Sequence, residues 1–305
     1  MAQGDRGTLG LVDCATPDVT FGGVTNWSLT TGLARQIAAS GGEVDPTFAA
    51  VMDIRPSVGF TTRQLTALSS FGIAGAEITN LDAWVQKLVK YGTRAGATSH
   101  TKLTIPTGMC VPRTLSAAQG QIATLGMEAI AISSDGTTAA ATVTVAQNLP
   151  TGGLTSLAWT LGPIVVNGTT IECESVTVDF GINLIVTGSG GQVYPTFIAV
   201  MDRRPTIRCT SKDLDTINTL YSAGVFAVAQ GATDSVVYFR KLAANGTRVA
   251  DATAEHIKLT VDDGLISLDA GSLQQGDISS VDFVIEPISD GSNAIIVVST
   301  ASAIT

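Results

Sequence analysis

The feature that most constrains the fold is an internal repeat. The segment GGEVDPTFAAVMDIRP at 41–56 aligns without a gap with GGQVYPTFIAVMDRRP at 190–205, and twelve of the sixteen positions are identical. A match of this length indicates a duplication, in which each copy forms the same structural unit. The sequence therefore predicts two tandem domains of one fold, covering 1–150 and 151–305.

The match continues in the same order along both copies. Four shorter segments pair: 61–65 with 210–214, 92–94 with 246–248, 99–104 with 255–260, and 134–136 with 289–291. The predicted join lies near 149–153, where Pro and Gly suit a short linker. We expect equivalent structural roles for the repeat-matched residues Pro46, Asp53, Arg55, Pro56, Thr61, Arg94 and His100 in the first copy, and Pro195, Asp202, Arg204, Pro205, Thr210, Arg248 and His256 in the second.

Most of each copy has the pattern of β-strands. Pro46 and Pro195 are predicted to open a strand, where a missing N–H is tolerated. Alternating apolar residues predict further strands at 58–60, 83–89 and 102–105, and at 207–209, 236–242 and 257–261. The Asp-Gly pairs at 135–136 and 290–291 predict a closing hairpin in each copy.

One helix is expected in each copy. Thr61 with Gln64, and Thr210 with Asp213, fit a capping box or its Asp variant. The apolar spacing that follows predicts helices over 62–70 and 211–223, ending at Gly72 and Gly224. The predicted fold class is mainly β: two tandem copies of an antiparallel β-sandwich or open barrel, each with one packed α-helix.

The sequence carries no pattern that favours an enzyme. Its four cysteines are scattered, which argues against zinc and favours buried free thiols. Asp53 and Asp202 raise the idea of an acid pair shared between repeats, but the Asp-Thr-Gly type of signature is missing. An ion pair between Asp53 and Arg55, two residues apart on one strand face, is the simpler interpretation. We expect no catalytic residue, no metal and no cofactor.

The two histidines, at matched positions, lack the nucleophile and orienting acid that a catalytic histidine needs. We interpret them as packing or hydrogen-bonding residues. No glycine-rich nucleotide fingerprint or phosphate-binding lysine motif is present either.

Composition favours self-association. The chain is 45% hydrophobic but only 14% charged, which is explained if much of its surface is buried against copies of itself. No apolar run reaches the length of a membrane-spanning helix, and the start lacks the pattern of a secretory signal, so we expect synthesis in the cytoplasm and no membrane partner.

The net charge is also unequally divided. The first copy carries a net charge of −1 and the second −8, for a total of −9. An acidic chain of this kind is not expected to hold nucleic acid tightly, because such binding requires clustered Lys and Arg.

The repeated segments PTF-x-AVMD-x-RP, T-x-x-(Q/D)-L, GTR and H-x-KLT resemble those of the major tail tube proteins of long-tailed bacteriophages. The resemblance implies a virion tail protein whose rings stack into a tube with a DNA channel. It implies rings of three chains with pseudo-sixfold symmetry, because each chain supplies two of six tube domains. The implied partners are other copies of the chain, other tail proteins, and DNA that passes without tight binding. We expect an acidic channel with more charge from the second copy.

Two other classes remain open at this point. A capsid decoration or baseplate protein is equally β-rich and low in charge, but would not polymerise end to end. A two-domain carbohydrate-binding or hydrolytic β protein would need aromatic or paired acidic residues that reach a sugar. The three tryptophans, Trp27, Trp84 and Trp159, do not match between the repeats and do not provide such a set.

Overall fold

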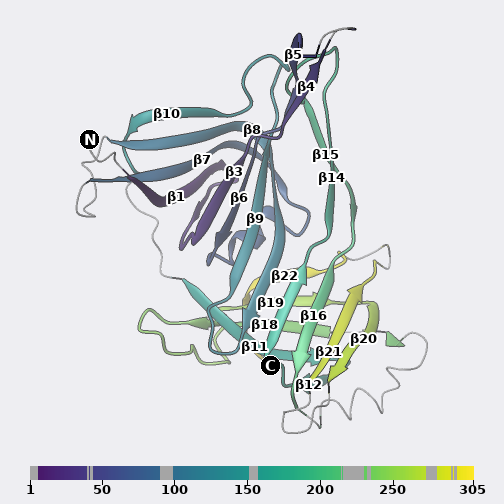
Figure 1. Cartoon of the computed structure of the whole chain (residues 1–305). Coiled ribbons are helices and arrows are strands. Elements are labelled where there is room, and N and C mark those ends of the chain that lie inside the picture. Colours follow the sequence, from purple (N-terminus) through teal and green to yellow (C-terminus); the bar gives the residue numbers. More distant parts are fainter. Residues whose placement is uncertain are drawn as a thin grey trace.

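The computed structural model describes residues 6–39, 41, 44–89, 99–150, 157–213, 215, 230–231, 235–272, 280–289, 291 and 294–305. These residues form antiparallel sheets with very little helix, as the sequence predicts (Figure 1). The first half contains β1 (Arg6–Thr16), β2 (Val19–Phe21), β3 (Asn26–Thr30), β4 (Leu33–Ala38), β5 (Phe48–Ile54), β6 (Ser57–Thr62), α1 (Ala67–Phe71), β7 (Ala76–Leu88), β8 (His100–Ala118), β9 (Thr124–Ala131) and β10 (Thr142–Gln147). The second contains β11 (Ala158–Val166), β12 (Thr169–Ile171), β13 (Ser175–Asp179), β14 (Ile182–Thr187), β15 (Phe197–Arg203), β16 (Thr206–Ser211), β17 (Gln230–Gly231), β18 (Ser235–Leu242), β19 (His256–Val261), β20 (Gly264–Ser272), β21 (Ser280–Pro287) and β22 (Val297–Ser302).

Strand β8 connects two sheets in the first half because it takes part in both. Its first part pairs with β7 and β10, which gives the order β2-β1-β7-β8-β10. Its second part pairs with β9, which gives the order β3-β6-β9-β8. Gly108 lies where the strand passes from one sheet to the other, and a Cβ there would stand 2.1 Å from the carbonyl oxygen of Ile130. The backbones approach so closely that only glycine fits without a shift.

The second half repeats this strand order. One sheet runs β12-β11-β18-β19-β22, and the other contains β13-β16-β21-β20. Among the described residues, β19 and β20 are separate strands where β8 is continuous. In the same way, β17, which pairs with β20, is separate from β18 where β7 is continuous. Gly264 occupies the place of Gly108, with a Cβ position 2.7 Å from the carbonyl oxygen of Glu286.

Irregularities of pairing recur as well. Register shifts occur between Leu9 and Val12 on β1 and between Leu161 and Ile164 on β11. The pairs β4–β5 and β14–β15, β8–β9 and β20–β21, and β10–β8 and β19–β22 also shift at matching places. Because a bulge re-aims the strand that carries it, shared bulges mean that both halves bend in the same way.

The core is formed by the facing sides of these sheets. Val58 and Phe60 on β6 are buried, as are Ile207 and Cys209 at the equivalent places on β16. The buried residues form one continuous apolar cluster that includes members of both halves. The predicted strands at 58–60 and 207–209 therefore alternate as expected.

The predicted helix is shorter and starts later than the sequence suggested. It covers Ala67–Phe71 and ends at Gly72, whose φ of 62° favours glycine. Thr61 does not cap it, because Thr61 lies within β6. Its neighbour Thr62 accepts a hydrogen bond from Gln64 N (3.0 Å) and donates one to a carbonyl oxygen on the β2–β3 connection (2.7 Å).

The second copy has the same arrangement. Ser211, not Thr210, accepts from Asp213 N (3.2 Å) and donates to Glu172 O (2.6 Å). Thr210 lies within β16. The hydroxyls therefore tie two connections together and do not form a capping box. The second predicted helix, 211–223, falls almost entirely outside the described residues.

Two other local predictions are wrong. Strands β5 and β15 begin at Phe48 and Phe197, so Pro46 and Pro195 precede the strands by two residues. The strands that flank the Asp-Gly pairs do not pair with each other either, although Asp290 itself lies outside the described residues. Strand β9 pairs with β6 and β8, whereas β10 pairs with β8 alone. The chain at 132–141 crosses from one sheet to the other, and the alternating apolar residues on its two sides belong to different sheets. The same holds for β21 and β22.

Cys14, Cys110 and Cys209 are buried, and Cys173 is half-buried. Burial raises the pKa of the Cys14 thiol to about 11 and the pKa of Cys110 well above its ordinary value. We therefore expect Cys14 to react with a thiol reagent at pH 8 about a hundredfold more slowly than a free cysteine, because the thiolate is the reactive form. Cys110 should react more slowly than a free cysteine for the same reason. Alkylation of native protein followed by peptide mass analysis measures this. Rapid labelling of either residue, with denatured protein as the reference, would contradict the buried positions.

Candidate self-assembly surface

The two halves are joined by strand pairing. The end of β8, Thr114–Ala118, pairs with Asp179–Ser175 of β13. Beyond the ladder, Gln119 N donates to Glu174 O (2.7 Å) and Phe180 N donates to Arg113 O (3.0 Å). This joint makes one continuous sheet in the order β3-β6-β9-β8-β13-β16-β21-β20. Each half contributes four strands in the same sequence.

The two end strands of this sheet correspond to the two strands that pair in the joint. Strand β3 corresponds to β13, and residues 270–272 of β20 correspond to 114–116 of β8, by their pairing with β6, β16, β9 and β21. Among the described residues, no strand pairs with the outer edge of β3 or with 270–272 on the side away from β21. Leu29 is 42% exposed, while its equivalent Val178 in the joint is fully buried. Open edges of this kind favour pairing with another chain.

One face of the continuous sheet is mostly polar, although Ile130, Leu265 and Val284 lie on it as well. Side chains alternate along a strand, so the residues between the buried ones share the opposite face. By register, that face carries Ser28, Thr30, Ser57, Gly59, Thr61, Thr114, Ser116, Thr124, Gly126, Glu128, Ser175, Thr177, Asp179, Thr206, Arg208, Thr210, Asp282 and Glu286. Hydroxyls dominate it, and Thr61 and Thr210 of the repeat-matched set lie here, at equivalent positions.

Charge on this face is sparse and unevenly divided. Glu128 of the first half forms an ion pair with Arg113 (2.7 Å). The second half contributes three carboxylates, Asp179, Asp282 and Glu286, and one guanidinium, Arg208. Among the described residues the face is therefore mildly acidic, with the excess in the second half.

Two long hairpins project from the sheets. In Figure 1, β4–β5 stands out at one end of the molecule, and β14–β15 runs from the second half along the first towards it. Their apolar side chains Phe48 and Met52, and the equivalents Phe197 and Met201, are all more than half exposed. Exposed apolar residues grouped in this way are typical of interaction surfaces.

The hairpins also carry the matched acidic and basic residues. Asp53 Oδ2 contacts Arg55 Nε at 2.5 Å, and Asp202 Oδ2 contacts Arg204 Nε at 3.5 Å. Each aspartate thus forms an ion pair with the arginine of its own hairpin. All four side chains are partly exposed, so the pairs contribute little to stability.

The two histidines are buried and make one matching hydrogen bond. His100 Nδ1 accepts from Lys87 N, and His256 Nδ1 accepts from Lys241 N, both at 3.0 Å. His256 Nε2 also lies 3.0 Å from Ala250 O, so this ring donates there as the neutral Nε2–H form. His100 thus binds strand β7, and His256 binds both strand β18 and the loop at Ala250.

Replacing His256 by Leu should lower the free energy of unfolding by about 2–4 kcal/mol, because Lys241 N–H and Ala250 C=O would both lose their partner. His256→Asn, which keeps a polar group at the site, should recover part of the loss. Chemical denaturation of the three proteins measures the order. A Leu variant as stable as the parent would contradict the structural role.

The other repeat-matched residues do not converge on a site. Pro56 and Pro205 are buried beside the hairpin bases, while Pro195 is buried and Pro46 is exposed. Arg248 forms an isolated bridge with Leu242. Arg94 lies outside the described residues.

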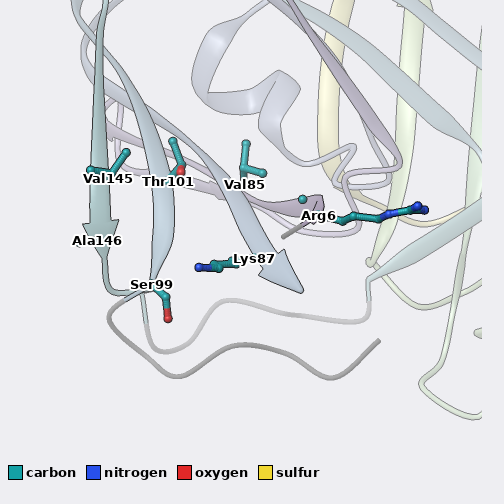
Figure 2. Close-up of a pocket in the computed structure, with 8 residues that line it drawn as sticks. Arg6, Val85, Lys87, Ser99, Thr101, Val145 and Ala146 are labelled. Carbon is teal, nitrogen blue, oxygen red and sulfur yellow. The ribbon is translucent and has the colours of Figure 1, made fainter. Parts of the chain in front are cut away.

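Several hollows open on the surface of the described residues. One, of about 450 Å³, lies among β1, β7, β8 and β10 and includes Arg6 and Lys87. Figure 2 shows these two side chains pointing away from each other, so they do not converge on an anion. Within the described ranges there is no cluster of His, Cys, Asp or Glu suited to a metal ion. In the same part of the chain, no helix has the length and apolar character needed to cross a membrane.

Sequence reasoning missed the joint itself, because it assigned no strand to the 106–118 or 175–179 segments. One signal was available: the matched HTKLTIPTG at 100–108 and HIKLTVDDG at 256–264 extend to a shared glycine.

Comparison of the chain with models of known protein families, and with curated protein sequences, gives no match.

Proposed function

We propose that this chain is a structural protein that closes rings of three chains, and that the rings stack into the tail tube of a long-tailed bacteriophage. The observation that carries the proposal is the strand joint between the halves. The chain forms this joint once, between β8 and β13. At opposite ends of the same sheet it has the equivalent strand segments, β3 and residues 270–272, each with an open edge. Pairing β3 of one chain with β20 of the next repeats the joint.

The number of chains follows from the tube-protein resemblance, in which six domains form a ring. A head-to-tail contact of this type closes into a ring when the rotation per unit divides a full turn. Two near-equivalent domains per chain then require three chains. Closure leaves no open sheet edge at the ring junctions, which removes the aggregation risk that such edges carry.

The polar face of the sheet suits the proposed channel. Hydroxyl groups and a few carboxylates offer no cluster of cations to a phosphate backbone, so DNA would pass without tight binding. The acidic excess on this face comes from the second half, which is the half expected to contribute more acidic charge to the channel. The chain needs no catalytic residue, metal or cofactor for this role, and its other partners would be tail proteins at the ends of the tube.

Electron microscopy of the purified protein over a range of concentrations and salt conditions tests the proposal. Stacked rings or tubes are the expected result. Compact rings that never stack would favour a decoration or baseplate protein instead. Monomers under every condition would remove the assembly proposal and leave a two-domain binding protein, including one for carbohydrate, as the alternative to examine.

A further inference from the structure

A second contact accompanies the strand joint inside the chain. The tip of the β14–β15 hairpin reaches the first half, where Val193 O accepts from Ile54 N (2.9 Å) and Pro195 O accepts from Ser133 N (2.8 Å). Tyr194 N also donates to Gly136 O (3.3 Å). The tip therefore docks on a face formed by the base of β5 and the turn after β9.

The tip of the other hairpin is bare. Val44, the equivalent of Val193, is 96% exposed, and Asp45 and Pro46 are exposed as well. In the docked hairpin, Pro195 is buried and Tyr194 packs against the apolar core. The same loop is thus covered in the second copy and uncovered in the first.

The face that would receive the bare tip is also uncovered. By the repeat, Ile54 corresponds to Arg203. The sequence alignment pairs Ser289 with Ser134, but in the structure Ser289 takes the place of Ser133, because Ile132 N and Ile288 N make the same bond to Thr107 O and Asp263 O. Arg203 and Ser289 are exposed, whereas Ser133 is buried. They border a hollow of about 520 Å³ that also includes Met201 and Ile295. The chain therefore has both an exposed hairpin tip and an exposed face equivalent to the one on which the other tip docks.

The sequence differences between the copies fall on this contact. Only four positions differ in the sixteen-residue match, and two of them are Asp45 against Tyr194 in the tip and Ile54 against Arg203 in the face. Inside the chain, the tip that carries Tyr194 meets a face that carries Ile54. The exposed tip carries a carboxylate and the exposed face carries a guanidinium, so the two are complementary in charge. In the contact formed inside the chain, the equivalent positions are both uncharged.

We infer that the tip of the β4–β5 hairpin, Val44–Pro46, docks on the Arg203–Ser289 face of a neighbouring copy of this chain, with Asp45 paired to Arg203. This inference rests on the proposed ring, because the strand joint between β3 and β20 brings the same two elements together. The ion pair selects the partner. If the tip with Asp45 docked on a face with Ile54, a carboxylate would be buried without a cation. The ion pair therefore disfavours contact between the first repeats of two chains.

Charge reversal tests the contact directly. Asp45→Arg and Arg203→Asp should each raise the concentration needed for ring formation about tenfold or more, because like charges then meet in every junction of the ring. The double variant, Asp45→Arg with Arg203→Asp, restores the attraction and should return assembly to within about threefold of the parent. Asp18→Arg makes the same change of charge in the exposed β1–β2 turn and should assemble normally. Mass photometry over a dilution series gives the comparison.

The outcomes separate the contact from the ring. If the parent forms rings and the single reversals do so equally well, the tip does not dock on this face although the ring stands. If both single variants fail and the double variant fails as well, the two side chains do not pair with each other. If the parent protein forms no ring at all, the proposed function fails and the docking inference fails with it.

Discussion

Replacing Leu29 by Asp is expected to abolish ring formation while leaving the monomer folded. Leu29 is 42% exposed in the single chain, so a carboxylate there keeps contact with water. In the proposed ring, it would occupy the position of Val178, which is fully buried in the internal joint. Burying an unpaired carboxylate costs about 3 kcal/mol or more, which weakens each junction by a factor of over a hundred.

A matched variant is available on another strand. Val143 on β10 is 63% exposed and takes no part in the joint or its open halves. Val143→Asp should assemble like the parent, and both variants should keep the parent's circular dichroism and cooperative unfolding. Sedimentation velocity compares the assembled fractions. Rings formed by the Leu29 variant at the parent's concentration would show that β3 is not a junction strand.

The second large effect concerns the glycines at the sheet crossing. Gly108→Ala would place a Cβ 2.1 Å from the carbonyl oxygen of Ile130, and neither backbone can move without breaking the β8–β9 ladder. We expect a loss of about 3 kcal/mol in the free energy of unfolding, in the range of severe overpacking. Gly264→Ala should have a smaller effect, because its Cβ position is 2.7 Å from the Glu286 carbonyl.

Gly59→Ala is the control for this effect. Gly59 lies on β6 of the same sheet, and a Cβ there meets only Ser28 Oγ at 3.5 Å, an ordinary contact. Its free energy of unfolding should change by less than about 1 kcal/mol, because neither a clash nor a positive φ opposes the methyl group. Urea denaturation of the three variants gives the order. Equal stability of the Gly108 and Gly59 variants would contradict the close approach of strands at the crossing.

The sequence predicted the class of the fold and the strands whose apolar residues alternate cleanly. Val58 with Phe60, and Ile207 with Cys209, lie on the predicted strands with the predicted periodicity. The capping signal at Thr61 was misread because a hydroxyl one residue later, on Thr62, serves tertiary contacts that local pattern does not reveal. The Asp-Gly turns failed for a related reason, since turn chemistry does not tell whether the flanking strands pair with each other.

The candidate assembly surface could be predicted only in outline. Low charge content and the repeat pointed to self-association, but the joint depends on which edges meet, and that is set by tertiary structure. The strand at 175–179 reads as an ordinary short alternation, and nothing in its residues shows that it pairs with 114–118. The differences at Asp45 and Arg203 were visible in the alignment, but their meaning required the hydrogen bonds by which the β14–β15 tip docks on the first half.

The central claim is that three chains close one ring through repeated copies of the internal joint. Native mass measurement of rings released from the assembled protein tests it most directly. The account predicts a species of three times the 31.3 kDa chain mass, with sixfold pseudosymmetry in averaged images. A ring of six chains would mean that only one half of each chain forms the wall, and it would contradict the account.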